Sequence, residues 1–156
     1  GGISQPMLLK LVNGIPSFFL VSNEWYAFCS NGNLWVGVGL TEKITYSLDN
    51  GETWMFSQSG FGTVGTCVAW NGTKFLAGGY NIPIDTSIGQ AFYSFDGINW
   101  TEILGQDFGT QILSVAWNGE YWIMTGLDNS NNPFVKNSFD NGLSWSNSNY
   151  NYTPNF

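Results

Sequence analysis

The chain has 156 residues, of which 17% are aromatic and only 10% are charged, with 20 glycines. This length suits one domain with a buried core, and the residue content is typical of short aromatic strands joined by tight turns. Four lysines, with no arginine or histidine, stand against eleven acidic residues. The net charge of −7 argues against a nucleic-acid partner and against adhesion to anionic membranes.

The first segment, residues 1–20, is expected to supply strands of a further unit through its KLVNGIPSFFLV stretch. No apolar run in the sequence reaches the roughly 20 residues that cross a bilayer, so we expect no membrane insertion. The chain begins with Gly-Gly and lacks the basic start of a signal peptide, which predicts a processed product or a piece of a longer protein.

From residue 25 onward the sequence repeats itself about every 45 residues. The similar windows are WYAFCSNGNLWVGVG (Trp25–Gly39), GTCVAWNGTKFLAGG (Gly65–Gly79) and ILSVAWNGEYWIMTG (Ile112–Gly126). Each window holds an Asn-Gly pair, which favours a hairpin with a two-residue turn. Each window is followed by a serine–tryptophan motif: SLDNGETW from Ser47, SFDGINW from Ser94 and SFDNGLSW from Ser138.

Each repeat predicts four antiparallel strands, because two follow from the hairpin and two more flank the serine motif. Units of four strands at this repeat length indicate an all-β fold of β-propeller blades. We expect blade 1 at 21–59, blade 2 at 60–104 and blade 3 at 105–150, with a tail at 151–156. Propellers close with roughly four to eight blades, so three blades predict an incomplete ring. Further blades outside this sequence, several chains sharing one ring, or an open stack remain alternatives.

Small residues recur at two positions of the first strand in each repeat. The equivalent sets are Ala27, Cys67 and Ser114, and Cys29, Ala69 and Ala116. Both sets lie on one face of the strand, since side chains alternate. They suit a crowded innermost strand, and this predicts packing roles for the two cysteines, with one disulfide as the alternative.

The three serine motifs resemble the Asp box of the bacterial neuraminidase repeat family, Ser/Thr-x-Asp-x-Gly-x-Thr-Trp. SLDNGETW fits every position, SFDNGLSW has Ser144 for threonine, and SFDGINW is one residue shorter. The resemblance covers about residues 21–150 and implies sialidase-like propeller blades in which these turns are structural. The residues concerned are Ser47, Asp49, Gly51, Trp54, Ser94, Asp96, Gly97, Trp100, Ser138, Asp140, Gly142 and Trp145.

Elementary chemistry gives these residues the same role. The aspartate can accept hydrogen bonds from backbone N–H groups of the turn, the glycine permits positive φ, and the tryptophan buries a large face. The alternative of a direct ligand or metal role is weak, because aspartates on three separate blades do not converge on one ion. We therefore expect no metal and no cofactor.

Catalytic sets are hard to find in this sequence. Sialidases of the resembling family clamp a carboxylate with three arginines, and this chain has none, so we expect no sialidase activity and no enzyme. Another glycosidase would need paired carboxylates. If strands alternate in direction, the loops opposite the serine motifs carry Glu42, Asp85 and Asp128, and a connection between blades brings Asp107 to the same side.

Two functions of different class remain. The first is a non-catalytic module for protein interaction or assembly, with other protein chains or further blades as partners. The second is a glycan-binding, lectin-like propeller or the remnant of a glycoside hydrolase. Its ligand-binding candidates are Glu42, Tyr80, Asn81, Asp85 and Asp128. The asparagine-rich, lysine-poor style favours a virion or extracellular setting.

Overall fold

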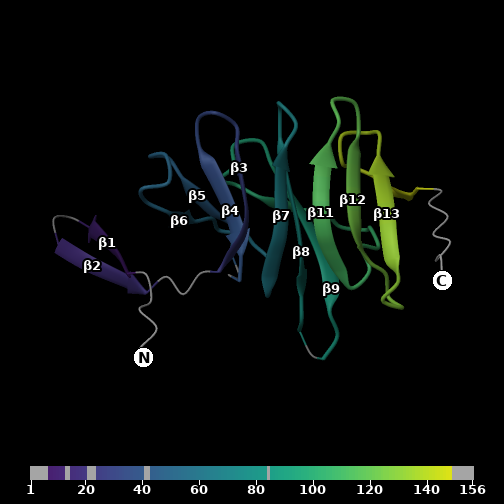
Figure 1. Cartoon of the computed structure of the whole chain (residues 1–156), viewed down its shortest axis with the longest axis horizontal. Helices are drawn as coiled ribbons and strands as arrows, with labels where there is room; N and C mark the ends of the chain where they lie inside the picture. The colour runs from purple at the N-terminus through teal and green to yellow at the C-terminus, as the bar shows by residue number, and fades with distance from the viewer. Residues whose placement is uncertain (1–6, 13–14, 21–23, 41–42, 84, 149–156) are drawn as a thin grey trace, which may run out of the picture.

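The computed structural model describes residues 7–12, 15–20, 24–40, 43–83 and 85–148, and the secondary structure in these ranges is entirely β. No helix in them has the length and apolar character of a membrane span. Three four-stranded antiparallel sheets follow one another along the chain and stand side by side (Figure 1). This confirms the predicted all-β fold of propeller blades.

Each sheet is a meander in which neighbouring strands are consecutive in the chain. Blade 1 consists of β3 (Trp25–Ser30), β4 (Trp35–Gly39), β5 (Thr45–Ser47) and β6 (Met55–Phe56). Blade 2 consists of β7 (Val64–Trp70), β8 (Phe75–Asn81), β9 (Ile88–Ser94) and β10 (Thr101–Glu102). Blade 3 consists of β11 (Gln111–Trp117), β12 (Trp122–Leu127), β13 (Pro133–Ser138) and β14 (Ser146–Asn147).

A separate two-stranded hairpin precedes the blades. It pairs β1 (Met7–Val12) with β2 (Ile15–Leu20) and lies beside blade 1, at the left of Figure 1. Residues 1–20 therefore contain two strands in these ranges, and their membership of a further blade stays a prediction.

The blades meet mainly through their first strands, β3 with β7 and β7 with β11. The outermost strands, β6, β10 and β14, contain only two residues each. Sheets that touch along their first strands and separate at their last ones fan around an axis, as propeller blades do.

The Asn-Gly turns differ in one respect from the expected geometry. Asn71 N–H donates to the carbonyl of Lys74, so the two central residues are Gly72 and Thr73, not Asn71 and Gly72. Gly72 has φ of +96°, a value that glycine adopts readily. The Asn71 side chain instead accepts hydrogen bonds from the N–H groups of Thr73 and Lys74. The same arrangement surrounds Asn118 in blade 3.

A β-bulge interrupts the pairing of the first two strands at the same place in every blade. The register shifts between Trp25 and Ala27, between Gly65 and Cys67, and between Ile112 and Ser114. Opposite each bulge lies a glycine, of which Gly79 is the example in blade 2. A Cβ atom on Gly79 would lie 2.1 Å from the carbonyl oxygen of Val64, so the bulged backbone approaches too closely for any side chain.

The hydrophobic core consists of two layers, each between adjacent blades. Blades 1 and 2 bury Val36 and Ile44 against Val68, Phe75 and Trp100. Blades 2 and 3 bury a second set in the same way: Leu76 and Ala91 against Ile112, Trp122 and Met124. Each blade therefore has an aromatic-rich face toward the preceding blade and a face of smaller residues toward the following one.

Candidate functional site

The three serine–tryptophan motifs form the connections between the third and fourth strands, and we call them the Ser–Trp turns (residues 47–54, 94–100 and 138–145). In blade 1 the Ser47 hydroxyl donates to Asp49 Oδ1 at 2.8 Å and accepts from Gly51 N–H at 2.8 Å. Trp54 Nε1 donates to the Gly51 carbonyl at 3.1 Å. The serine, the glycine and the tryptophan thus lock one turn.

The carboxylates of these turns accept several hydrogen bonds. Asp49 Oδ1 accepts from Thr53 N–H at 2.8 Å, and Asp49 Oδ2 accepts from the Thr53 hydroxyl. These bonds, led by the one from the Thr53 hydroxyl, lower the pKa of Asp49 to about 2. Asp140 has the same pattern with Ser144, and its pKa is also lowered to about 2. Such carboxylates stay ionised and suit turn closure, not proton donation.

The shorter motif of blade 2 keeps the pattern despite its missing residue. Asp96 accepts from the N–H groups of Ile98 and Asn99 and from the Asn99 side chain. Partial burial opposes ionisation of Asp96, but these bonds outweigh it and bring its pKa to about 2. The glycine at this turn, Gly97, has φ of +76°.

Ser–Trp turns also receive a side chain from the preceding blade. Leu34 of blade 1 packs against Gly97 of blade 2. Lys74, at the equivalent position of blade 2, packs against Gly142 of blade 3, and its Nζ lies 4.9 Å from the ring centroid of Tyr93. Burial lowers the pKa of Lys74, whereas the charge of Asp140 opposes that shift.

On the opposite side of the sheets lie the loops that join the second and third strands (Figure 1). Asn81 ends β8, and its Oδ1 accepts from the Thr63 hydroxyl at 3.2 Å. Tyr80 precedes it and is half-buried, whereas Asp85 is exposed further along the loop. Asp85 lines neither of the two pockets described below. Glu42 lies outside the described residues.

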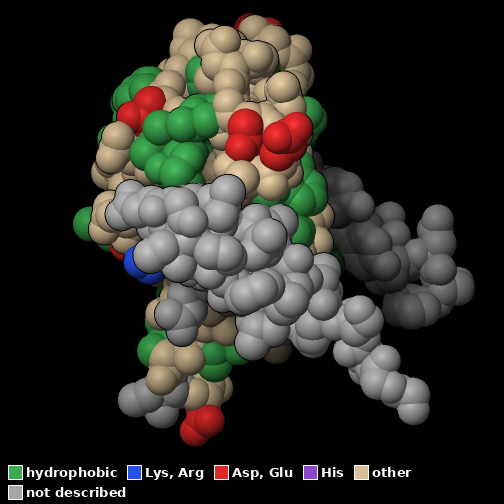
Figure 2. All heavy atoms as spheres, turned by 90° about the vertical axis from the view of Figure 1, so that its left-hand side faces the viewer, with side chains coloured by type: hydrophobic (Ala, Val, Ile, Leu, Met, Phe, Trp, Pro, Cys, Tyr) green, Lys and Arg blue, Asp and Glu red, His purple; other side chains and the backbone are tan. Residues whose placement is uncertain are grey.

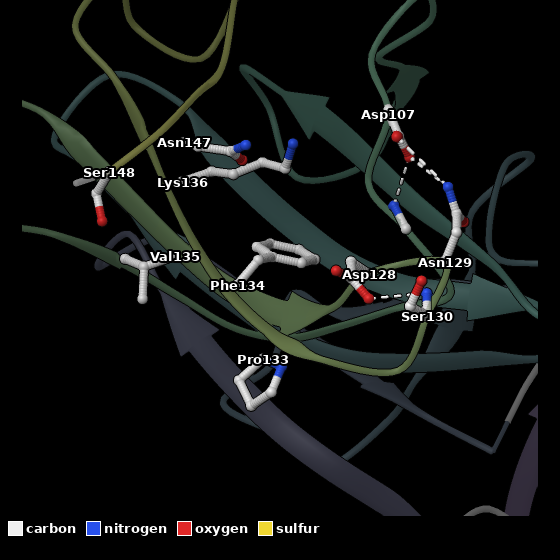
Figure 3. Close-up of a pocket in the computed structure, with 11 residues that line it drawn as sticks. Asp107, Asp128, Asn129, Ser130, Pro133, Phe134, Val135, Lys136, Asn147 and Ser148 are labelled. Atoms are coloured by element: carbon white, nitrogen blue, oxygen red, sulfur yellow. Dashed lines mark hydrogen bonds between the residues drawn. The ribbon is translucent and has the colours of Figure 1, made fainter. Parts of the chain in front are cut away.

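The structure brings Asp128 together with Asp107 instead. Both line a pocket of about 440 Å³ beside β13, together with Asn129, Phe134 and Lys136 (Figure 3). Position on the loops suggested the two aspartates, but nothing in the sequence marked the other three residues. They are recognisable only once the loop is folded back against β13.

Hydrogen bonds within the loops engage both carboxylates of this pocket. Asp128 Oδ1 accepts from the N–H groups of Ser130 and Asn132, both at 2.8 Å (Figure 3 shows the first). These backbone bonds lower the pKa of Asp128. Asp107 Oδ1 accepts from Gly109 N–H at 2.9 Å. A general acid needs a raised pKa, so Asp128 is poorly suited to that role.

An equivalent pocket lies one blade earlier. It has a volume of about 480 Å³ and lies between blades 1 and 2, where Gln90, Phe92 and Glu102 take the places of Phe134, Lys136 and Asn147. The first pocket is lined by blade 3 and the segment that leads into it, and the second by residues of blades 1 and 2. A hollow at the same strand positions of two blades indicates a feature of the repeat and not one dedicated cleft.

Two uncovered sheet faces are the other candidate surfaces. The aromatic end face belongs to blade 1 and comprises Phe28, Trp35 and Trp54. Figure 2 looks onto this side of the molecule, where hydrophobic side chains reach the surface. Phe28 is 47% exposed and Trp35 is 40% exposed, whereas their equivalents are 9% and 0% exposed in blade 2 (Val68, Phe75) and 8% and 0% in blade 3 (Val115, Trp122).

The small-residue end face belongs to blade 3 and comprises Ser114, Ala116, Ile123 and Val135. Ser114 and Ala116 are exposed and the other two are half-buried. The equivalents of Ile123 and Val135 in blade 2 are Leu76 and Ala91, which are fully buried. Among the described residues, no further blade covers either end face.

The described residues contain no group of three or more carboxylate, thiol or imidazole side chains that could hold a metal ion. Cys29 is half-buried and Cys67 is buried, and neither forms a disulfide. Burial raises the pKa of the Cys67 thiol to about 11, which suits a packing residue and not a nucleophile.

Comparison with known proteins adds information on the fold. No family model and no curated protein matches the chain. Among solved structures, the chain is similar to a GH74 enzyme of Niastella koreensis, with a TM-score of 0.51 and 19% sequence identity. The match covers 78% of this chain but only 17% of that enzyme. The chain therefore shares its blade architecture with part of a propeller-type glycoside hydrolase.

Proposed function

We propose that the chain is a non-catalytic propeller module that acts in protein interaction or assembly. The observation that carries this proposal is the pair of uncovered end faces on blades 1 and 3. Phe28 and Trp35 are exposed at positions where blades 2 and 3 bury their side chains. Exposed contiguous apolar surface of this kind is typical of protein-binding sites.

The pKa values of four aspartates also favour a non-catalytic role. The aspartates of the Ser–Trp turns and Asp128 have lowered pKa values because they accept hydrogen bonds. A glycosidase pair needs one carboxyl group that holds its proton near neutral pH.

A photo-reactive residue placed at Trp35 tests the proposal, with the same residue at exposed Thr101 on the outer strand of blade 2 as the control. We expect protein adducts from position 35 and not from position 101, in the cells that express the chain. A folded variant that yields equal adducts at both positions, or none, contradicts an interaction role for the aromatic end face.

Glycan recognition is the second candidate, favoured by the pocket that joins Asp107, Asp128 and Asn129 beside the Phe134 ring. Carboxylates and amides can hydrogen-bond sugar hydroxyls, and an aromatic ring can stack on a sugar. A polysaccharide panel, read by binding and by release of reducing ends, separates the two functions. Release that Asp128→Asn abolishes would overturn the non-catalytic proposal.

A further inference from the structure

The two end faces match each other as the buried blade interfaces do. At the interface of blades 1 and 2, Val68 packs in one cluster with Ala27 and Cys29. At the next interface, Val115 packs with Cys67 and Ala69. On blade 3 the residues equivalent to Cys67 and Ala69 are Ser114 and Ala116. On blade 1 the residue equivalent to Val68 and Val115 is Phe28.

We propose that a second copy of this chain covers both end faces, with the small-residue end face of each copy docked on the aromatic end face of the other. This inference rests on the proposed interaction function and names its partner. Two copies of the three blades in the described residues give six, within the roughly four to eight at which propellers close. A head-to-tail contact that closes after two copies leaves no end face exposed.

The Ser–Trp turns supply a second, independent match. Leu34 and Lys74 pack against the turn glycines of the following blade, and the next residue of this series is Tyr121. The turn glycine that receives no such residue within the described chain is Gly51, where a Cβ would meet only the Trp54 ring of its own turn, at 3.9 Å. Docking head to tail brings Tyr121 of one copy onto Gly51 of the other.

A polar contact repeats in the same register. Asn71 Nδ2 donates to Asn141 Oδ1 at 2.7 Å between blades 2 and 3. Asn118 is the equivalent of Asn71, and Asn50 is the equivalent of Asn141. Asn50 and Asn141 share a positive φ, of 58° and 60°. The docked copies thus reproduce this hydrogen bond between Asn118 and Asn50.

The sequence specifies both halves of this contact on one chain, which is the reason for choosing a second copy over an unrelated partner. An unrelated protein has no cause to match the spacing of Phe28, Gly51 and Asn50 at one end and that of Ala116, Tyr121 and Asn118 at the other. A second copy matches both at once.

Sedimentation velocity of the full chain, over a wide concentration range, tests the inference. We expect a species of twice 17.2 kDa. Phe28→Asp and Ala116→Lys, each on its own, should raise the dissociation constant by at least about tenfold because each introduces an unpaired charge into the contact. Thr101→Asp, on the exposed outer strand of blade 2, should leave it unchanged.

Mixing the two charged variants is the decisive step. One contact of the mixed pair places the new carboxylate at position 28 of the first variant against the new ammonium group at position 116 of the second, and the other contact is unaltered. The mixture should therefore dimerise although neither variant does alone.

A mixture that stays monomeric while both variants keep native near-ultraviolet circular dichroism overturns the inference. A monomeric unaltered chain whose aromatic end face is covered by its own β1–β2 hairpin overturns it as well. Neither result changes the photo-adduct or polysaccharide tests of the proposed function.

Discussion

Asn71 of blade 2 and Asn141 of blade 3 join two blades by a side-chain hydrogen bond of 2.7 Å. Asn141 Oδ1 also accepts from Trp122 Nε1 at 3.3 Å, and its backbone has positive φ. One exposed asparagine therefore connects a hairpin of blade 2 with a Ser–Trp turn and with a core tryptophan of blade 3.

Asn141→Gly should lower the free energy of unfolding by about 1 kcal/mol, because glycine keeps the backbone conformation and removes only the hydrogen bonds. Urea unfolding monitored by tryptophan fluorescence measures the change. Asn50→Gly is the matched control, since Asn50 has the same turn position and positive φ in blade 1. Below the concentration at which copies associate, it should cost nothing; equal losses in both variants would disprove the inter-blade role.

Lys74→Leu should leave the melting temperature unchanged or raise it. Lys74 is only 2% exposed and burial lowers its pKa, so keeping its ammonium group charged reduces the free energy of unfolding. Leu34 already occupies the equivalent position in blade 1, and a buried charge can often be replaced by an apolar residue without loss. Lys74→Glu, which puts a second negative charge near Asp140, should destabilise strongly, and differential scanning calorimetry distinguishes the two results.

Gly79→Ala should destabilise the chain by about 1–3 kcal/mol, because the new methyl group must displace both the Val64 carbonyl and the Phe61 ring. Gly105→Asn provides the comparison: φ of Gly105 is +74° and no atom lies within 4 Å of the position that a Cβ would occupy. Asparagine tolerates such a conformation, so that variant should unfold near the unaltered chain. Thermal unfolding of the two variants side by side checks the difference.

Acid should destabilise the chain between about pH 4 and pH 2. The pKa values of Asp49, Asp96 and Asp140 fall from 3.8 to about 2 on folding. The unfolded chain therefore binds more protons in this range, and the contribution of these groups is complete above pH 4 and lost as the pH approaches 2. Melting temperatures across this range should fall less steeply for Asp140→Asn than for the unaltered chain, and parallel profiles would show that the turn carboxylate contributes nothing.

The blades could be predicted from the sequence because their determinants are local. Asn-Gly pairs and Ser–Trp motifs each fix a turn through bonds within a few residues, such as those from Ser47 and Thr53 to Asp49. Their repetition then gave the strand count of each unit. The centre of the hairpin turn is also local but was wrongly predicted, because the Asn71 side chain accepts the hydrogen bond from Lys74 N–H and the turn shifts by one residue.

The surfaces between blades could not be predicted in the same way. Lys74 packs against Gly142 of another repeat, 68 positions later in the chain, and no residue near Lys74 in the sequence marks that contact. Asp107 and Asp128 were placed on one side of the molecule by strand direction alone, but the folded loops were needed to show that they share a pocket and that Asp85 does not.

Every blade carries two unlike faces, one aromatic-rich and one built from smaller residues, and the order of the two is the same in all three. The same pair of unlike faces therefore meets at each junction between units. Tandem duplication or loss of a whole unit keeps unlike faces together at each new junction, so the evolutionary history of such a gene can proceed in steps of about 45 codons. Insertions of other lengths break the alternation and are expected to be confined to the loops opposite the Ser–Trp turns.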